Sequence, residues 1–201
     1  FLNFIGYSPC DFKGRSSPVI IFENASNGIL EKILEFDKNK DDDFLLDDTK
    51  KLIIIYGIAS AMSYLHLHDI IHCNLKPSNI LVDDFLFPKI TGFYDSKKHS
   101  MDNNRDLADY YNIPSEISID LLFKMNVYYE RIEFDIYKSP MLFFSKKTST
   151  LDDVYSFGLI MYRLITGEMP FPNYQPKKTI DDIYTKGLRP SFIHPVPECY
   201  K

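Results

Sequence analysis

The sequence lacks the features that mark nucleic-acid-binding, disulfide-bonded or membrane-spanning proteins. Its 201 residues carry a formal net charge of -5 and no long run of Lys and Arg, which argues against a surface built to neutralise phosphates. Its three cysteines, Cys10, Cys73 and Cys199, are far apart and show no C-x-x-C spacing, so we expect free thiols in a reducing compartment. The longest apolar run, residues 52–59, is too short to span a bilayer, and no leader pattern opens the chain. We therefore expect a cytoplasmic protein that binds no nucleic acid and does not span a membrane.

The composition is typical of one globular domain, with 45% hydrophobic and 25% charged residues. Strand-like runs at 4–8 and 19–23 are separated by Gly14 and Pro18, which predicts a β-hairpin. Two further short strands are predicted at 80–82 and 89–91.

Apolar spacing predicts helices over 29–36, 49–67 and 152–166, the second with Asp47 among its capping residues. A capping box that begins at Thr179 predicts another helix, which ends near Gly187. We expect the core-facing residues at the positions that repeat at helical intervals: Ile29, Ile33 and Phe36 in the first helix, Leu52, Ile55, Tyr56, Ala59, Met62 and Leu65 in the second, and Val154, Phe157, Ile160, Met161, Leu164 and Ile165 in the third.

Two clusters superficially resemble metal sites. The acidic run 37–43 has oxygen ligands at alternate positions, but the sixth position of a calcium loop is not Gly and the twelfth is Asp48 rather than Glu. His66, His68 and His72 are spaced so that they do not share one helix face. We expect a solvated acidic connection and no histidine metal site.

The most specific pattern lies in residues 68–98. Residues 72–81 read His-Cys-Asn-Leu-Lys-Pro-Ser-Asn-Ile-Leu, and they are followed by Pro-Lys-Ile at 88–90 and Gly-Phe-Tyr at 92–94. This pattern resembles the H-R-D-L-K-x-x-N catalytic loop and the D-F-G segment of protein kinases. The resemblance implies an α+β, protein-kinase-like fold, in which residues 1–24 are a remnant of the small lobe with the hinge and 25–201 are the large lobe, truncated before its last helices.

The resemblance also assigns the catalytic positions. Lys76 and Asn79 match the family's phosphate and metal contacts, with Asn79 as a weak metal ligand, whereas Asn74 stands in place of the catalytic aspartate and Gly92 in place of the metal-binding aspartate. Cys73 replaces the arginine that reads a phosphorylated activation segment, so we expect no switching of that kind.

Further positions are assigned by the same resemblance to nucleotide binding or to the framework. Glu23 and Ala25 correspond to the hinge that meets adenine, and Leu81 to a residue packed under adenine. The framework positions are His72 and Phe93, which resemble part of the family's hydrophobic spine, and Asp153, which resembles the carboxylate that braces the catalytic loop.

The substitutions point to impaired catalysis. A neutral amide at Asn74 cannot serve as the proton acceptor, and loss of a positioned base costs roughly 10²- to 10⁴-fold in rate. Gly92 offers no ligand to Mg²⁺, and the sequence contains neither a glycine-rich phosphate loop nor a V-A-I-K lysine. The resemblance implies ATP and Mg²⁺ as cofactors, and these missing groups weaken that expectation for both.

We therefore predict a pseudokinase that acts as an interaction or signalling module for other proteins. Candidate contact surfaces are 170–190 and the tyrosine-rich segment 95–139, which contains a predicted helix at 114–125 and closes with Ser-Pro-Met in place of A-P-E. One alternative is an active serine/threonine kinase that uses displaced acids, for which the candidates are Asp83, Asp84 and Asp95. A second alternative is a truncated, non-functional fragment.

Overall fold

The computed structural model describes residues 1–39, 46–98, 136–141, 148–173, 175–192 and 196, and the description below concerns these. They form two compact units. The first combines Phe1–Ala61 with Pro77–Thr91, and the second combines Met62–Lys76 with Gly92–Lys201. Helices and small antiparallel sheets both occur, so the predicted α+β class is confirmed. The predicted division after residue 24 separates a small-lobe remnant from the large lobe. It is not a division into these compact units, and it stays a prediction.

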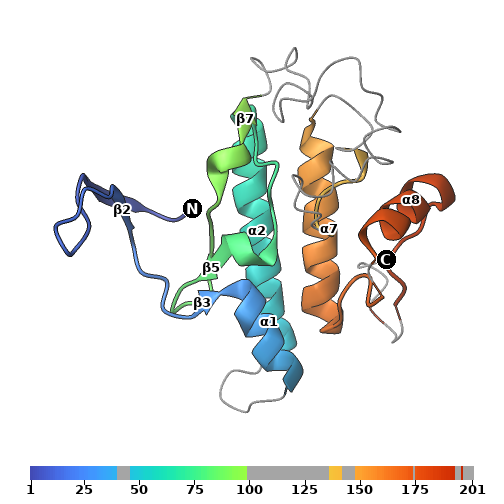
Figure 1. Cartoon of the computed structure of the whole chain (residues 1–201). Helices are drawn as coiled ribbons and strands as arrows, with labels where there is room; N and C mark the ends of the chain where they lie inside the picture. Colours follow the sequence, from blue (N-terminus) through green and yellow to red (C-terminus); the bar gives the residue numbers. More distant parts are fainter. Residues whose placement is uncertain (40–45, 99–135, 142–147, 174, 193–195, 197–201) are drawn as a thin grey trace, which may run out of the picture. The chain divides into compact units, whose positions relative to one another are not determined.

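The first unit contains two small sheets. Strand β1 (Phe4–Ser8) pairs antiparallel with β2 (Val19–Phe22), which confirms the hairpin, and most of its apolar side chains are exposed. The second sheet has the order β3-β5-β6, with β3 (Gly28–Ile29) and β6 (Pro88–Ile90) on either side of β5 (Ile80–Val82). Helix α1 (Leu30–Asn39) contacts β3 and β5 (Figure 1).

Helix α1 exists as expected, but part of its predicted core face is wrong. Leu30, Ile33 and Leu34 are buried, whereas Phe36 is 53% exposed. Ile29 belongs to β3 rather than to the helix. The helix therefore begins one residue later than its apolar pattern does, and its buried face is rotated accordingly.

Helix α2 (Asp48–Leu67) runs from the first unit into the second. Its start is fixed by Asp47, whose carboxylate accepts a hydrogen bond of 2.8 Å from the Lys50 backbone N–H. The predicted core face is correct at two positions and wrong at others. The buried side chains are Ile54, Ile58, Met62 and Leu65; the exposed ones include Leu52 and Tyr56, while Ile55 and Ala59 are half-buried. Because apolar residues occur on all sides of this helix, periodicity alone could not select the buried face.

The second unit contains a short pair of strands and two helices. Strand β4 (Ile70–Ile71) pairs antiparallel with β7 (Lys97–Lys98), and a single-turn helix η3 (Phe93–Asp95) precedes β7. Helix α7 (Thr150–Thr166) begins where the Ser149 backbone N–H donates to the Asp152 carboxylate at 2.8 Å. It ends at Gly167, whose φ of 70° is left-handed as expected for a C-terminal glycine.

Helix α7 buries polar groups as well as apolar ones. Ile160 and Leu164 are fully buried as predicted, but Val154 is 54% exposed, and Asp153 and Arg163 are among the buried residues. Helix α8 (Pro176–Lys186) ends before Gly187 as predicted, but it begins earlier than Thr179. The capping-box prediction is therefore wrong. Pro176 suits the first helical position, and Thr179 lies inside the first turn, where its hydroxyl accepts a hydrogen bond of 3.1 Å from the Gln175 backbone.

The predicted helix at 114–125 and most of the tyrosine-rich segment lie outside the described residues. Residues 40–43 of the acidic run also lie outside them. Within the part of the chain that the structure describes, no helix is both long enough and apolar enough to cross a membrane.

Candidate functional site

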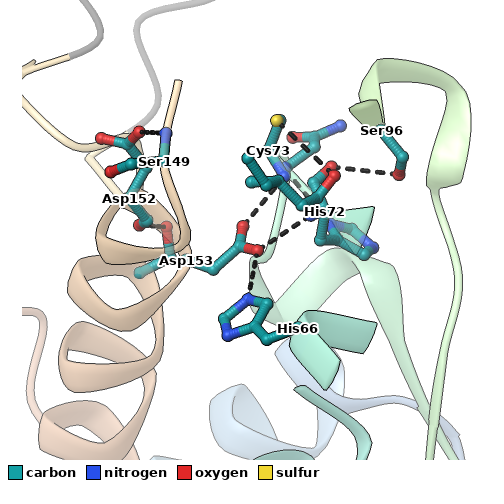
Figure 2. Close-up of polar contacts among 10 residues, drawn as sticks. His66, His72, Cys73, Ser96, Ser149, Asp152 and Asp153 are labelled. Carbon is teal, nitrogen blue, oxygen red and sulfur yellow. Dashed lines mark hydrogen bonds and ion pairs between the residues drawn. The ribbon is translucent and has the colours of Figure 1, made fainter. Parts of the chain in front are cut away.

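The centre of the site is the buried carboxylate of Asp153 on α7, which is 1% exposed. Its Oδ2 accepts a hydrogen bond of 2.8 Å from the His72 backbone N–H, and its Oδ1 accepts one of 2.9 Å from that of Cys73. The Nε2 of His66 on α2 lies 2.9 Å from Oδ2 (Figure 2). A carboxylate only accepts hydrogen bonds, so this ring nitrogen is the donor. Asp153 therefore fixes the backbone that precedes Asn74, and breaking these contacts would leave a buried charge unpaired.

Cys73 occupies a constrained position in this loop. Its φ of 62° lies in the left-handed region, which is uncommon for a residue with a side chain. The hydrogen bond from its N–H to Asp153 holds this conformation. Burial, with the negative charge of Asp153 as a smaller contribution, raises the pKa of the Cys73 thiol to about 12. The thiol therefore stays protonated at neutral pH and is a poor nucleophile.

Asn74, predicted to stand in place of the catalytic base, is 3% exposed and forms hydrogen bonds inside the chain. Its side-chain Nδ2 donates to the hydroxyl of Tyr94. Its backbone N–H donates to Nδ1 of His72 at 3.2 Å. The side chain at this position is thus an amide donor engaged by a neighbouring hydroxyl group, and it offers no carboxylate to accept a proton.

Gly92, predicted to stand in place of the metal-binding aspartate, has φ 83° and ψ 36° and lies immediately before η3. Glycine adopts this left-handed conformation readily because it has no Cβ. The backbone at Gly92 is therefore suited to glycine, and it places no ligand there for a cation.

The residues after Gly92 are held against the loop at several points. The rings of Phe93 and His72 are in contact, with centroids 4.8 Å apart, and the Ser96 hydroxyl donates to the His72 carbonyl at 3.2 Å. Asp95 lies 4.0 Å from the Lys138 ammonium. The pairing of β7 with β4 continues this contact. His72, Asn74, Gly92, Phe93 and Asp153 thus all belong to one arrangement in the second unit, together with the half-buried Lys76 of the same loop.

The remaining predicted site residues belong to the first unit. The Glu23 carboxylate accepts a hydrogen bond of 2.9 Å from the Asn3 backbone, which lowers its pKa, and it lies 3.4 Å from the Lys89 ammonium. The carbonyl of Ala25 accepts a turn hydrogen bond from Gly28 at 3.0 Å. The carbonyl of Asn79 accepts one from Thr91 at 2.9 Å, and Leu81 lies in β5 opposite Ile29. The nucleotide and metal roles of these residues stay predictions.

Each acid considered as a displaced catalytic group has another partner. Asp83 Oδ1 accepts hydrogen bonds from the backbones of Phe85 and Phe87, at 3.0 Å and 2.9 Å. Asp84 accepts a hydrogen bond from the Ser26 hydroxyl. Asp95 has the Lys138 contact described above. Among the residues that the structure describes, no group of three or more His, Cys, Asp or Glu side chains is arranged to hold a metal ion.

Two functional contacts were missed by sequence reasoning. His66 was considered only as a metal ligand, whereas it contacts Asp153. Tyr94 was given only as part of the Gly-Phe-Tyr pattern, whereas its hydroxyl accepts a hydrogen bond from Asn74. The signal for the second was present, because a tyrosine beside Phe93 introduces a hydroxyl where the family pattern has no side chain.

The whole arrangement agrees with the comparison to known families. The protein kinase domain model matches residues 11–195, which is most of the chain. The chain therefore belongs to the protein kinase family, and the resemblance predicted from its loop motifs is confirmed.

The chain is similar to several proteins whose names describe them as kinases. The chain is 28% identical over 192 residues to a probable LRR receptor-like serine/threonine-protein kinase of Arabidopsis thaliana, which covers 92% of this chain and 18% of that protein. It is 31% identical over 151 residues to a probable serine/threonine-protein kinase of Dictyostelium discoideum, covering 75% and 13%. It is 28% identical over 182 residues to mitogen-activated protein kinase kinase kinase 13 of Mus musculus, covering 90% and 16%. The chain spans less than a fifth of the length of each.

Proposed function

We propose that this kinase-family chain is catalytically impaired and acts as an interaction or signalling module for other proteins. The observation that carries the proposal is the state of position 74, where an amide in place of the base is already hydrogen-bonded to Tyr94. Gly92 adds the loss of a metal carboxylate in a backbone conformation that favours glycine. The framework around these positions keeps its contacts, as expected if the fold is used without the chemistry.

The family generally uses ATP and Mg²⁺, and the candidate contacts in this chain are Lys76, Asn79 and the hinge at Glu23 and Ala25. Phosphoryl transfer depends on positioned charges around the phosphates. We propose that weak nucleotide binding through these residues persists without useful turnover. We also propose a cytoplasmic location, because the cysteine spacing favours free thiols.

The alternative of an active kinase with displaced acids is less well supported. Asp83 accepts a hydrogen bond within the turn between β5 and β6, Asp84 accepts one from Ser26, and Asp95 lies beside Lys138. Recruiting any of them to a metal would require it to exchange these contacts, and catalytic geometry tolerates only a fraction of an ångström.

A transfer assay with radiolabelled ATP and Mg²⁺ tests the proposal directly. We expect no turnover above background for the chain, and the same result for Lys76→Ala. Magnesium-dependent turnover that Lys76→Ala abolishes would establish the active-kinase alternative instead. A thermal-shift titration with ATP, with and without Mg²⁺, measures binding separately, because a ligand that binds only the folded state raises its stability.

The second alternative, a non-functional fragment, is tested by urea denaturation. A cooperative unfolding transition of residues 1–201 supports an independently folded module. A gradual loss of signal with no transition would support the fragment.

A further inference from the structure

The residues from 93 to 98, called here the 93–98 segment, contact the catalytic loop and the strand β4 before it at several points. Lys98 and Lys97 pair with Ile70 and Ile71. Ser96 bonds to the His72 carbonyl, and Phe93 packs on the His72 ring. Tyr94 then reaches the end of this series at Asn74. Strand β7, Ser96, Phe93 and Tyr94 therefore all contact the stretch from residue 70 to residue 74.

The Tyr94 contact differs from the others in its surroundings. The tyrosine is 71% exposed, so little of its ring is held by packing. Its hydroxyl nevertheless meets an amide on a residue that is 3% exposed. A hydrogen bond to a buried amide costs more to lose than one at the surface, because water does not readily replace the lost interaction there. The hydroxyl group is therefore the part of Tyr94 that is expected to determine its position.

Several contacts of the 93–98 segment are made by groups of the chain itself. They include a ring contact, two side-chain hydrogen bonds and the ion pair between Asp95 and Lys138. At Gly92, where the family has the residue that links this segment to a metal ion, the chain has no side chain. The ring contact and the two hydrogen bonds attach the segment to the loop, and these interactions need neither a cation nor a nucleotide.

We infer that Tyr94 is a positioning residue that, through Asn74, holds the 93–98 segment closed on the catalytic loop without nucleotide or Mg²⁺. The closed state is then built into the apo protein, and it presents one fixed surface to a partner whether or not ATP is present. This inference rests on the proposed function, because it assigns to an internal hydrogen bond the ordering role that a bound metal has in an active enzyme.

Hydrogen exchange followed by mass spectrometry tests the inference in the chain of residues 1–201. The readout is the exchange rate of the Ser96, Lys97 and Lys98 amides, which lie in the η3 turn and the β4–β7 pairing. In Tyr94→Phe we expect these amides to exchange about 3- to 10-fold faster, the factor that corresponds to losing one ordinary hydrogen bond. In the unmodified chain, ATP with Mg²⁺ should leave the rates unchanged.

Tyr56→Phe is the matched control, because Tyr56 is 76% exposed on α2 and removal of its hydroxyl should leave the 93–98 segment unaffected. Asn74→Ala should reproduce the Tyr94→Phe effect, and the double variant should exchange no faster than either single one. Asn74→Asp should restore slow exchange, because a carboxylate can accept the hydrogen bond that the Tyr94 hydroxyl donates.

The inference is overturned if Tyr94→Phe and the unmodified chain exchange alike, if the single effects add in the double variant, or if protection appears only with ATP and Mg²⁺. Urea midpoints of each variant identify any that are globally destabilised. If Asn74→Ala is globally destabilised, the comparison of Tyr94→Phe with Tyr56→Phe still tests the inference. A radiolabel transfer assay separates this inference from the proposed function. Turnover would contradict impaired catalysis, whereas the exchange rates alone test the positioning role of Tyr94.

Discussion

The backbone of the catalytic loop and its reactive side-chain positions differ in what supports them. The backbone at His72 and Cys73 is held by Asp153, which also contacts His66 on α2. The reactive positions hold an amide at Asn74 and no side chain at Gly92. Buried contacts hold the shape of the loop, whereas phosphoryl transfer in this family depends on particular charged side chains. The comparison teaches that these two sets of groups are separable.

The largest effect is expected at the buried carboxylate. Asp153→Ala removes the acceptor of the His72 and Cys73 backbone N–H groups and should lower the free energy of unfolding by about 3–5 kcal/mol. Urea denaturation measures it. Asp181→Ala, at an exposed carboxylate on α8, is the control and should change stability by less than about 0.5 kcal/mol. Equal effects would mean that Asp153 is not a special support.

A second test addresses framework packing away from the loop. A Cβ at Gly57 would lie 2.5 Å from Cδ and Cγ of Pro88, so Gly57→Ala must displace the proline ring. We expect a loss of about 1–3 kcal/mol, typical of overpacking. Gly158→Ala on α7 meets no atom within 4 Å and should instead be neutral or stabilising. Thermal unfolding measures the stability of both variants. Equal stabilities would contradict the overpacking expected at Gly57.

The next effect concerns restoration of a lost acid. Gly92→Asp must place a side chain at φ 83°, so we expect a loss of about 1 kcal/mol. Gly92→Ala should show a similar loss without supplying a carboxylate, which separates backbone strain from charge. Urea unfolding curves of both variants measure the cost. A stabilised Gly92→Asp would indicate that this position still accommodates the family residue.

The smallest effect is a pH dependence at the start of α7. Burial raises the pKa of Asp152 above 3.8, its ordinary value. The folded state then binds the proton more tightly than the unfolded state does, so this group reduces stability as pH rises from 3.8 through the raised pKa. Asp152→Asn should remove that decrease. Denaturation series from acidic to neutral pH compare the variant with Asp181→Asn, which should keep the unmodified dependence.

Much of the fold could be predicted from the sequence, because the hairpin and the ranges of α1, α2 and α7 follow from local spacing and turn residues. The buried faces could not. In α2, Ile54 and Ile58 lie inside while Tyr56 is exposed, since the pattern is apolar on several sides and tertiary packing selects one. The start of α8 was missed because Pro176 and Thr179 both favour a helix start, and the proline prevailed.

The candidate site was predictable to a similar degree. The family motifs predict the roles of Asn74 and Gly92, which stay predictions, and they also pointed to Asp153, whose carboxylate contacts the loop backbone. The Asn74–Tyr94 hydrogen bond could not be derived from motif spacing, because it depends on the backbone conformation at Gly92 and on the direction of an exposed side chain. Contacts of this kind arise from the three-dimensional arrangement rather than from the residue types alone.

The β1–β2 hairpin has a practical consequence for every measurement proposed above. Phe4, Ile5, Tyr7 and Ile20 are each more than half exposed on a sheet of two strands. Both strands of a two-stranded sheet are edge strands, and here they carry exposed apolar side chains. Together these features favour aggregation by strand addition. Dilute samples and light-scattering checks should therefore accompany purification, and Ile20→Lys is a reasonable first choice for improving solubility.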